Sequence, residues 1–566
     1  MNLFRRTFIR RARKEASHEI LPEDVFLDSQ NLSKLNIHQM EGHLERPLGR
    51  HVFYVAILLA TLLIFGFTYR LFSMQIVNEK IYSEKADKNH LKKIPLFALR
   101  GTISDRNGKL LAWNRDATST EEIPHRVYTP THGFSHVLGY VSYPKKDTSG
   151  IFWQDEYIGK DGLEKQYQTT LQGVQGERVI AINALNEIEA QNVIALPVSG
   201  ENIITTLDKD VQAKLYESIV NLAKRASFTG GAGVIMDVRT GAILALTSYP
   251  EYSNNRMVNA ETSEEKKQVS KDLLDNRHVF LNRVVGGLFT PGSTVKPFIA
   301  IAALMENVIT PEKNIYSSGQ LVIKNKYGGP DTVFKDWKAH GYTDMRKAIA
   351  QSSDEYFYQI GGGFQDQVGL GIARINIYAN LFGFATTTGI DLPGEEAGII
   401  PSPQWKKKVF NEEWLVGNTY HTSIGQYGFQ ITPLELVRAI ASIANGGELV
   451  VPHIVHPTKE SIKLDLKEKD LKVIREGMYK VVYDEGGTAK PLNMYGVSIA
   501  AKSGTAELGV SKQLVNSWIS GYFPYDNPKY AFVVIMEKGS RHNPYGAVFA
   551  AQETIEWMRD NTEYTK

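Results

Sequence analysis

The sequence predicts an α+β protein held in a membrane by a single N-terminal helix. Three features indicate this class: a charge-free apolar run after the first 50 residues, hairpin signals in the region that follows, and long strands interleaved with helices in the remainder. Because single cores rarely grow beyond roughly 250–300 residues, a chain of 566 residues should contain more than one folded unit.

The composition restricts the possible chemistry. A formal net charge of +2 gives no reason to expect a nucleic-acid partner, and the ordinary apolar and charged fractions favour a globular protein with a large core. The chain has no cysteine. Disulfides, cysteine-type zinc sites and thiol catalysis are therefore excluded, which fits an extracytoplasmic protein stabilised by packing alone.

Residues 51–69 have the length and composition of a membrane-spanning helix. These 19 residues include no Lys, Arg, Asp or Glu and would span about 28 Å, close to the bilayer hydrocarbon core. A buried soluble helix is the alternative, but such helices normally keep a polar stripe. A cleaved signal peptide does not fit the long segment before the run. We expect a single-pass anchor over residues 51–71.

The orientation of this anchor follows from the basic residues that precede it. By the positive-inside rule, residues 1–50 form a cytoplasmic tail and the chain after the helix lies outside. Acidic residues from Glu15 to Asp28 dilute the basic cluster, which weakens a nucleic-acid interpretation. The basic residues are Arg5, Arg6, Arg10, Arg11, Arg13, Lys14, Arg46 and Arg50.

Residues 72–205 are expected to form a small, mainly β region. Residues 72–93 should continue the membrane helix as an amphipathic helix or stalk. Asp105-Arg106-Asn107-Gly108 predicts a tight hairpin, because Asn-Gly readily adopts the positive φ of a hairpin turn. Residues 162–167 open a short helix, and residues 201–207 form the strand that leads out of the region.

Residues 206–566 are predicted to form an antiparallel sheet flanked by helices, with an all-helical subdomain. Asp208 should cap a helix that runs toward Ala226. Hairpins open and close this part, and between them lie a helix and one more strand, whose end carries Lys502. The hairpin strands are residues 232–237 with 242–248 and residues 517–523 with 530–537; the helix is residues 432–445 and the last strand residues 497–503.

Ser293-Thr294-Val295-Lys296 places a hydroxyl and an amine one helical turn apart on the same face. Serine needs an adjacent base to become a strong nucleophile, and a lysine amine can supply it. Pro291 and Pro297 are tolerated only near the first turn of a helix, so the helix must begin close to Ser293. The hydroxyl then lies at the positive end of the helix dipole. The spacing alone is common by chance in a chain of this length.

Ser352-Ser353-Asp354 lies between two helical stretches. One interpretation is simply a Ser/Asp cap on the second helix. In the functional interpretation, Ser352 relays a proton between Lys296 and the leaving amine, and Asp354 helps to hold the network. Capping and catalysis are compatible here.

Lys502-Ser503-Gly504-Thr505 is expected at a strand end, and an ordinary strand terminus with a Gly-containing turn is the simpler interpretation. Gly504 would permit close approach of a substrate backbone. Lys502, Ser503 and Thr505 supply a cation and hydroxyls for a substrate carboxylate, and the backbone N–H groups of Ser293 and Thr505 would form an oxyanion hole. The three motifs in this order predict a serine acyl-transfer site.

With these three motifs in this order, the chain resembles a class B penicillin-binding protein, more like the elongation type than the division type. The resemblance runs from the membrane helix nearly to the C-terminus. The segments that carry it are Arg100-Gly101 through Asn107-Gly108, residues 231–252, Phe289-Thr290-Pro291-Gly292-Ser293, Thr388-Gly389-Ile390-Asp391-Leu392-Pro393-Gly394-Glu395, Thr422-Ser423-Ile424-Gly425-Gln426, Thr432-Pro433-Leu434 and residues 502–506.

The resemblance implies a transpeptidase domain over residues 206–566 and a reduced pedestal, or dimerisation-like, domain over residues 72–205. It implies a single-pass protein of the bacterial inner membrane, with the catalytic domain extracytoplasmic. It also implies a D,D-transpeptidase that cross-links peptidoglycan stem pentapeptides during cell-wall elongation and is acylated by β-lactams. A SEDS-family glycan polymerase and other elongation-complex proteins are the implied partners, and no cofactor is implied.

Three departures from the family pattern stand out. Only a short stretch separates Gly108 from Tyr140, where relatives carry a larger head that contacts the polymerase. Residues 425–428 read Gly-Gln-Tyr-Gly where relatives often have Gly-Gln-Gly, which changes the rim of the cleft. Some elongation-type relatives bind zinc near the active site. Asp336 and His340 are weak candidates, but without a cysteine ligand we expect no metal and interpret His340 as a structural or substrate-rim residue.

The leading hypothesis is acyl transfer in two steps. Ser293, deprotonated by Lys296, attacks the penultimate D-alanine carbonyl, and the terminal D-alanine leaves with a proton supplied through Ser352. An amine from a neighbouring stem then resolves the acyl-enzyme, while the charge of Lys502 keeps part of the Lys296 population neutral. A D,D-carboxypeptidase or β-lactam-hydrolysing enzyme would use the same residues. A non-catalytic scaffold that activates the polymerase, or a β-lactam sensor, is the non-enzymatic alternative.

Overall fold

The computed structural model describes residues 49–115, 123–148, 152–182, 188–260, 262–456 and 461–566. Most of the predicted cytoplasmic tail lies outside these residues. The chain forms two compact units, one ending at His90 and the other running from Leu91 to Lys566. The domain boundaries expected at residues 71 and 205 stay predictions.

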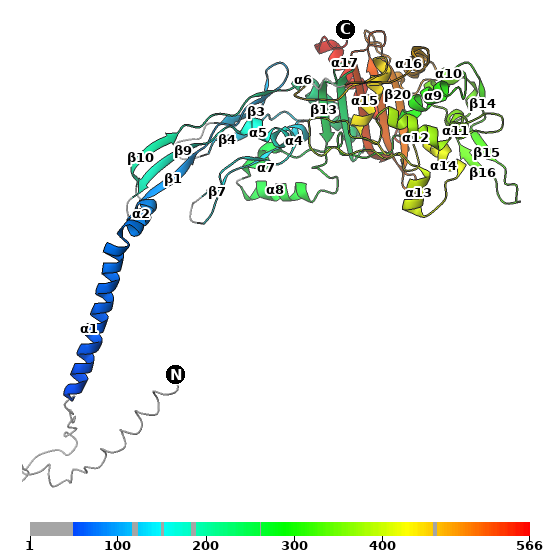
Figure 1. Ribbon diagram of the computed structural model, residues 1–566. Coiled ribbons are helices and arrows are strands. Elements are labelled where there is room, and N and C mark those ends of the chain that lie inside the picture. The colour runs from blue at the N-terminus through cyan, green and yellow to red at the C-terminus, as the bar shows by residue number, and fades with distance from the viewer. Residues whose placement is uncertain (1–48, 116–122, 149–151, 183–187, 261, 457–460) are drawn as a thin grey trace, which may run out of the picture. The chain divides into compact units, whose positions relative to one another are not determined.

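The first unit contains the apolar helix α1 (Arg50–Phe72) (Figure 1). All of its described side chains are exposed, and with the following π-helical turn η4 (Ser73–Val77) it provides 28 residues, enough to cross a membrane. The helix or stalk expected over residues 72–93 is not one continuous helix, because the Asn78 N–H and side-chain amide both donate to the Ser73 carbonyl, at 3.0 and 2.9 Å. Helix α2 (Glu79–His90) follows, and the chain becomes a strand at Leu91.

The second unit begins with two small sheets. The first has the order β1 (Leu91–Leu96), β9 (Gly176–Ile182), β10 (Ile188–Ala195), all antiparallel. The second has the order β11 (Ile203–Ile204), β2 (Ile103–Ser104), β3 (Leu110–Arg115), β4 (His125–Tyr128). The predicted hairpin joins β2 to β3, with Gly108 at φ 80°. The strand expected over residues 201–207 is only two residues long and pairs in parallel with β2.

Short helices and strand pairs complete this mainly β part. Helix α4 (Gly162–Gln166) occupies the predicted position and carries the buried Glu164. The Glu164 carboxylate accepts from Arg100 Nε at 2.5 Å and from Arg126 Nε at 2.7 Å, so one buried acid ties two segments to the helix. The other elements are α3 (Ser135–Leu138), α5 (Gln168–Gln172), β5 (Val141–Ser142) with β8 (Ile158–Gly159), and β6 (Lys145–Lys146) with β7 (Phe152–Gln154).

A five-stranded antiparallel sheet forms the centre of the remainder. Its order is β13 (Ile243–Tyr249), β12 (Gly230–Asp237), β22 (Tyr530–Ser540), β21 (Leu514–Phe523), β20 (Ala500–Leu508) (Figure 1). Both predicted hairpins are present, and successive residues of the inner strands are buried, so both faces of the sheet are covered. Helix α6 (Lys209–Ala226) packs on β12 and is capped by Asp208 as predicted.

Helices pack around this sheet, and further helices pack on one another to form a second, mostly helical part. Helix α15 (Pro433–Ala444) packs on β12, β21 and β22, and α17 (Ala547–Asn561) packs on α6. The helical part also contains two small strand pairs, β14 (Ile315–Ser317) with β17 (Gly341–Thr343) and β15 (Gln320–Ile323) with β16 (Thr332–Lys335). The remaining elements are α7 (Asn254–Asn259), α8 (Ser263–Leu273), α9 (Lys296–Met305), α10 (Met345–Gln351), α11 (Asp354–Gly362), α12 (Gly371–Leu381), α13 (Pro403–Phe410), α14 (Val416–Ser423), α16 (Glu468–Tyr483), β18 (Glu448–Leu449), β19 (Ile462–Lys463), and the 3₁₀ turns η5 (Gly292–Val295) and η6 (Lys490–Leu492).

Candidate active site

Ser293 lies in the 3₁₀ turn η5, directly before helix α9, which confirms the predicted helix start. The backbone N–H of Lys296 donates to the Ser293 carbonyl, so one turn separates the two residues. Gly292 has φ +56°, and its N–H donates to the Gly425 carbonyl at 3.0 Å. Ser293 is half-buried, whereas the side chain of Lys296 is fully buried. The hydroxyl is therefore the accessible member of the pair.

The Lys296 ammonium is held by the second motif. Lys296 Nζ donates to the Ser352 carbonyl at 2.7 Å, to Ser352 Oγ at 3.3 Å and to Asp354 Oδ1 at 2.6 Å. The ring of Phe357 lies 5.3 Å from the same nitrogen. Ser353 caps α11 by accepting from the Tyr356 N–H, which confirms the capping interpretation of this motif. The contacts of Ser352 and Asp354 with Lys296 are compatible with the functional interpretation, which stays a prediction.

The third motif meets the second at Ser352. Lys502 Nζ donates to Ser352 Oγ at 2.9 Å and to the Ser503 carbonyl at 2.8 Å. One hydroxyl oxygen thus accepts from two lysines that are more than 200 residues apart in the sequence. The structure brings together Lys296, Ser352, Asp354 and Lys502 as the sequence predicted.

The position of the third motif within its strand differs from the prediction. Strand β20 begins at Ala500 and continues to Leu508, so Lys502 to Thr505 lie inside the strand and not at its end. The reason is the pairing with β21, which runs in register from Ala500 opposite Tyr522 to Leu508 opposite Leu514. Gly504 does not make a turn. A Cβ there would lie 2.7 Å from Thr294 Cγ2, so the glycine allows β20 to pack on η5.

The predicted substrate-binding positions line this edge of the sheet. β20 is an outer strand, with β21 on one side only. Thr505 is exposed and Ser503 is half-buried, with Ser503 Oγ 2.6 Å from Thr488 Oγ1. A Cβ at Gly292 would lie 2.8 Å from the Thr505 carbonyl, so the segments that carry the proposed oxyanion-hole N–H groups of Ser293 and Thr505 are in contact.

Burial and the neighbouring charges shift the pKa values of Lys502 and Asp354. Burial lowers the pKa of Lys502 well below its usual value, and the charge of Lys296 lowers it further, while Asp354 opposes the shift. Burial raises the pKa of Asp354, although Lys296 acts in the opposite direction. The side chains of two buried lysines, Lys296 and Lys502, therefore share the negative charge of one nearby carboxylate, Asp354.

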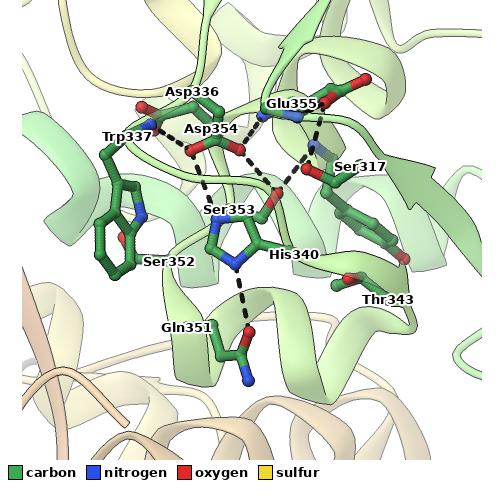
Figure 2. Close-up of polar contacts among 12 residues, drawn as sticks. Ser317, Asp336, Trp337, His340, Thr343, Gln351, Ser352, Ser353, Asp354 and Glu355 are labelled. Carbon is green, nitrogen blue, oxygen red and sulfur yellow. Dashed lines mark hydrogen bonds and ion pairs between the residues drawn. The ribbon is translucent and has the colours of Figure 1, made fainter. Parts of the chain in front are cut away.

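Asp336 and His340, the weak metal candidates, lie next to the second motif (Figure 2). His340 Nε2 is 3.4 Å from Asp336 Oδ1, and His340 Nδ1 is 3.1 Å from Gln351 Oε1. The described residues contain no group of three or more His, Asp or Glu side chains that could hold a metal ion. A zinc ion needs about four ligands, so the residues present do not fit one.

Two contacts that support the site could not be read from the sequence. Thr488 supports Ser503, and its only sequence signal is its position after the Gly486-Gly487 pair. Gly425 has φ +75°, and a Cβ there would lie 2.1 Å from the Gly292 carbonyl, so this glycine seats the turn that carries Ser293. The sequence shows Gly425 only as part of the 422–426 segment, which does not indicate the contact with Gly292.

Comparisons with known proteins place the chain in a family. The model of the penicillin-binding protein transpeptidase domain matches residues 231–554, and that of the penicillin-binding protein dimerisation domain matches residues 117–205. The transpeptidase match alone covers more than half of the chain. The chain belongs to the penicillin-binding protein transpeptidase family.

Individual relatives are similar over most of the chain. Peptidoglycan D,D-transpeptidase MrdA of Haemophilus influenzae is 30% identical, with 86% of this chain and 88% of the relative covered. The penicillin-binding protein PBP2 of Helicobacter pylori, solved in complex with MreC, is 28% identical with a TM-score of 0.68, covering 83% of this chain and 99% of that one. A chain of a solved peptidoglycan synthase complex is 26% identical with a TM-score of 0.70, covering 91% and 99%.

Proposed function

We propose that the chain is an elongation-type peptidoglycan D,D-transpeptidase in which Ser293 is the nucleophile. The observation that carries the assignment is the bridge that Ser352 Oγ makes between the ammonium groups of Lys296 and Lys502. Lys296 itself lies one turn from the accessible Ser293. Family membership and the names of the curated relatives support the same reaction class.

In the first step, Ser293 Oγ attacks the carbonyl carbon of the penultimate D-alanine. Lys296, in its neutral form, takes the hydroxyl proton, and the new oxyanion is met by the N–H groups of Ser293 and Thr505. The peptide C–N bond then breaks. The proton passes from Lys296 through Ser352 to the leaving nitrogen, and the terminal D-alanine departs as a free amine.

In the second step, an amine of a neighbouring stem attacks the ester carbonyl of the acyl-enzyme. Its proton returns along the same path, through Ser352 to Lys296, and the C–O bond to Ser293 breaks with return of a proton to Ser293 Oγ. Lys502, with Ser503 and Thr505, binds the terminal carboxylate of the donor stem, as a cation and hydroxyls at a strand edge can.

The setting proposed for this reaction is the outer face of a bacterial cytoplasmic membrane. Helix α1 serves as the single-pass anchor, and the basic residues before it favour a cytoplasmic N-terminus. The complexes in which the similar structures were solved, one with MreC and one a peptidoglycan synthase, support assembly with elongation proteins and a SEDS-family polymerase.

The test is covalent labelling by a fluorescent penicillin. Ser293→Ala should abolish labelling, while Ser511→Ala, which alters an exposed residue in the turn after β20, should label like the wild type. Mass spectrometry should place the adduct on the peptide that contains Ser293. Labelling that persists in Ser293→Ala would refute the assignment, and rapid release of the adduct would indicate a hydrolase.

A further inference from the structure

A second layer of side chains lies behind the turn between α10 and α11 (Figure 2). The side chain of Asp336, which follows β16, is completely buried. Its Oδ2 accepts from Ser353 Oγ at 2.9 Å and from the Glu355 N–H at 2.9 Å. Its Oδ1 accepts from the Trp337 N–H at 2.7 Å. One carboxylate therefore holds the residues on both sides of Asp354.

His340 extends this layer to the other side of Ser352. The side chain of His340 is also completely buried, with Nε2 facing Asp336 Oδ1 and Nδ1 facing Gln351 Oε1. Gln351 is the last residue of α10 and directly precedes Ser352. Positions 351, 353 and 355 are thus tied to Asp336, directly or through His340. The alternating positions 352 and 354 are the two that contact Lys296.

The turn needs such support because of its backbone conformation. Ser352 has φ +57° and ψ +41°, in the left-handed region that residues with a Cβ rarely adopt. In this conformation its carbonyl and its hydroxyl both accept from Lys296. Relaxation of the turn to a more common conformation would move both acceptors together.

The atoms of this layer are already used by one another. Asp336 accepts from three protein donors and faces His340, and both ring nitrogens of His340 have protein partners. No third His, Asp or Glu completes a metal cluster among the described residues. Direct hydrogen bonds hold these side chains, without a need for a bridging ion.

We propose that Asp336 is a positioning residue that acts through Ser353, the Glu355 N–H and the His340–Gln351 pair to hold Ser352 and Asp354 against Lys296. The inference rests on the proposed acyl-transfer function. Asp336 touches neither the substrate nor the reacting atoms. Its effect on the rate comes from the geometry of the proton path, to which small displacements matter greatly.

The main experiment measures acylation of the full-length, detergent-solubilised protein by a chromogenic β-lactam. Asp336→Asn leaves one acceptor oxygen where the carboxylate has two, so the donors of Ser353, Glu355 and Trp337 can no longer all be satisfied. The first-order acylation constant should fall by about 10- to 100-fold. The dissociation constant of the non-covalent complex should stay close to that of the wild type, because β20 is untouched. The adduct should still form on Ser293.

The matched control separates positioning from general destabilisation. Asp344 caps the other end of α10 by accepting from the Lys347 N–H at 2.8 Å. Asp344→Ala should lower the melting temperature and yet acylate at the wild-type rate. If Asp336→Asn acylates like the wild type, or if Asp344→Ala loses as much acylation as Asp336→Asn, the proposal is wrong.

Two further arms keep the test decisive. If Asp336→Asn does not fold, Gln351→Met, which removes only the acceptor for His340, should still slow acylation by about 3- to 10-fold. An unchanged rate would overturn the proposal.

A chelator should leave both the melting temperature and the acylation rate of the wild type unchanged. Losses of both that added Zn²⁺ restores would also overturn the proposal. Absence of a Ser293 adduct in the wild type would instead defeat the proposed function.

Discussion

Ser352 is the residue on which the geometry of the site depends. Its hydroxyl oxygen accepts from Lys296 and from Lys502, which uses both of its lone pairs. Its own proton must therefore point to a third partner, away from both lysines. In the proposed reaction that partner is the leaving nitrogen. Ser352 is therefore oriented to donate its own proton to that nitrogen and to accept a proton from Lys296.

The buried charge of Lys502 predicts the pH dependence of acylation. Its pKa is lowered by burial and by Lys296, so the ammonium that binds the substrate carboxylate should be lost well below pH 10.5. Asp354 raises this pKa, and Asp354→Asn removes that negative charge. The alkaline limb of the acylation rate should then move to lower pH.

Stopped-flow acylation across the neutral to alkaline range measures this limb. Glu507→Gln is a suitable control, because it removes a carboxylate on the same strand that pairs with Lys512 and Arg541 and not with Lys502. The control should leave the limb in place. A limb that moves to higher pH in Asp354→Asn, or does not move at all, contradicts the electrostatic account.

At the scale of elements, the site depends on the close packing of β20 against η5. Gly504 and Gly292 are the contact points, since a Cβ at either would lie within 3.0 Å of an atom of the other segment. Lys502 and Thr505 belong to β20, whereas Ser293 belongs to η5. The relative position of the nucleophile and the carboxylate-binding residues is set at this contact.

Gly504→Ala should separate the two elements. The new methyl group would lie 2.7 Å from Thr294 Cγ2 and 3.0 Å from the Pro291 carbonyl, and overpacking of this kind destabilises by about 1–3 kcal/mol. We expect a lower melting temperature. We also expect at least a roughly tenfold loss of acylation rate, because displacing the nucleophile from the carboxylate-binding residues by about 1 Å is enough to slow the reaction strongly.

A neighbouring glycine gives the comparison for this variant. Gly509 lies in the turn after β20 with φ +67°, and no atom lies within 4 Å of a Cβ built there. Gly509→Asn, a residue that tolerates this conformation, should retain the wild-type acylation rate. Equal losses in the two variants would show that β20 as a whole, and not its contact with η5, is sensitive to substitution.

At the scale of the whole molecule, the region before residue 206 is joined to the part that follows it by buried and partly buried polar contacts. His136 Nε2–H donates to the Val279 carbonyl at 2.8 Å, Tyr167 Oη–H donates to Asp391 at 2.7 Å, and Gln212 donates to the Gly133 carbonyl at 2.8 Å. These hydrogen bonds connect residues on the two sides of the expected boundary.

The His136 contact predicts a loss of stability in acid. Burial lowers its pKa from 6.5 to about 4, with Arg283 acting in the same direction and the hydrogen bond to Val279 opposing. As the pH falls below 6.5, the unfolded chain gains a proton at this histidine that the folded protein does not accept until about pH 4. Stability should therefore decrease over this window, by about 3 kcal/mol in full.

Thermal unfolding of the full-length protein at a series of pH values measures this effect. His136→Gln can still donate to the Val279 carbonyl but cannot be protonated, so its melting temperature should fall less steeply than that of the wild type as the pH is lowered. Parallel slopes in the two proteins would argue against a role for His136 in acid destabilisation.

The sequence by itself determined those features whose causes are local. The apolar run became α1, Asn107-Gly108 made its hairpin, Asp208 capped α6, and Pro291 and Pro297 fixed the helix start next to Ser293. Periodicity, capping and turn chemistry act over a few residues, so they can be read along the chain. The order of the three motifs also predicted one site made of Ser293, Lys296, Ser352, Asp354 and Lys502, and the structure brings the last four into contact.

Only the tertiary structure decided how these residues meet. β20 continues past Gly504 because β21 and η5 hold it on two sides, although the glycine alone suggested a turn. Asp336 supports the Ser352 turn through contacts that span up to 19 residues, and Ser352 joins two lysines from distant segments. Such arrangements depend on packing between elements far apart in the chain, which no local pattern encodes.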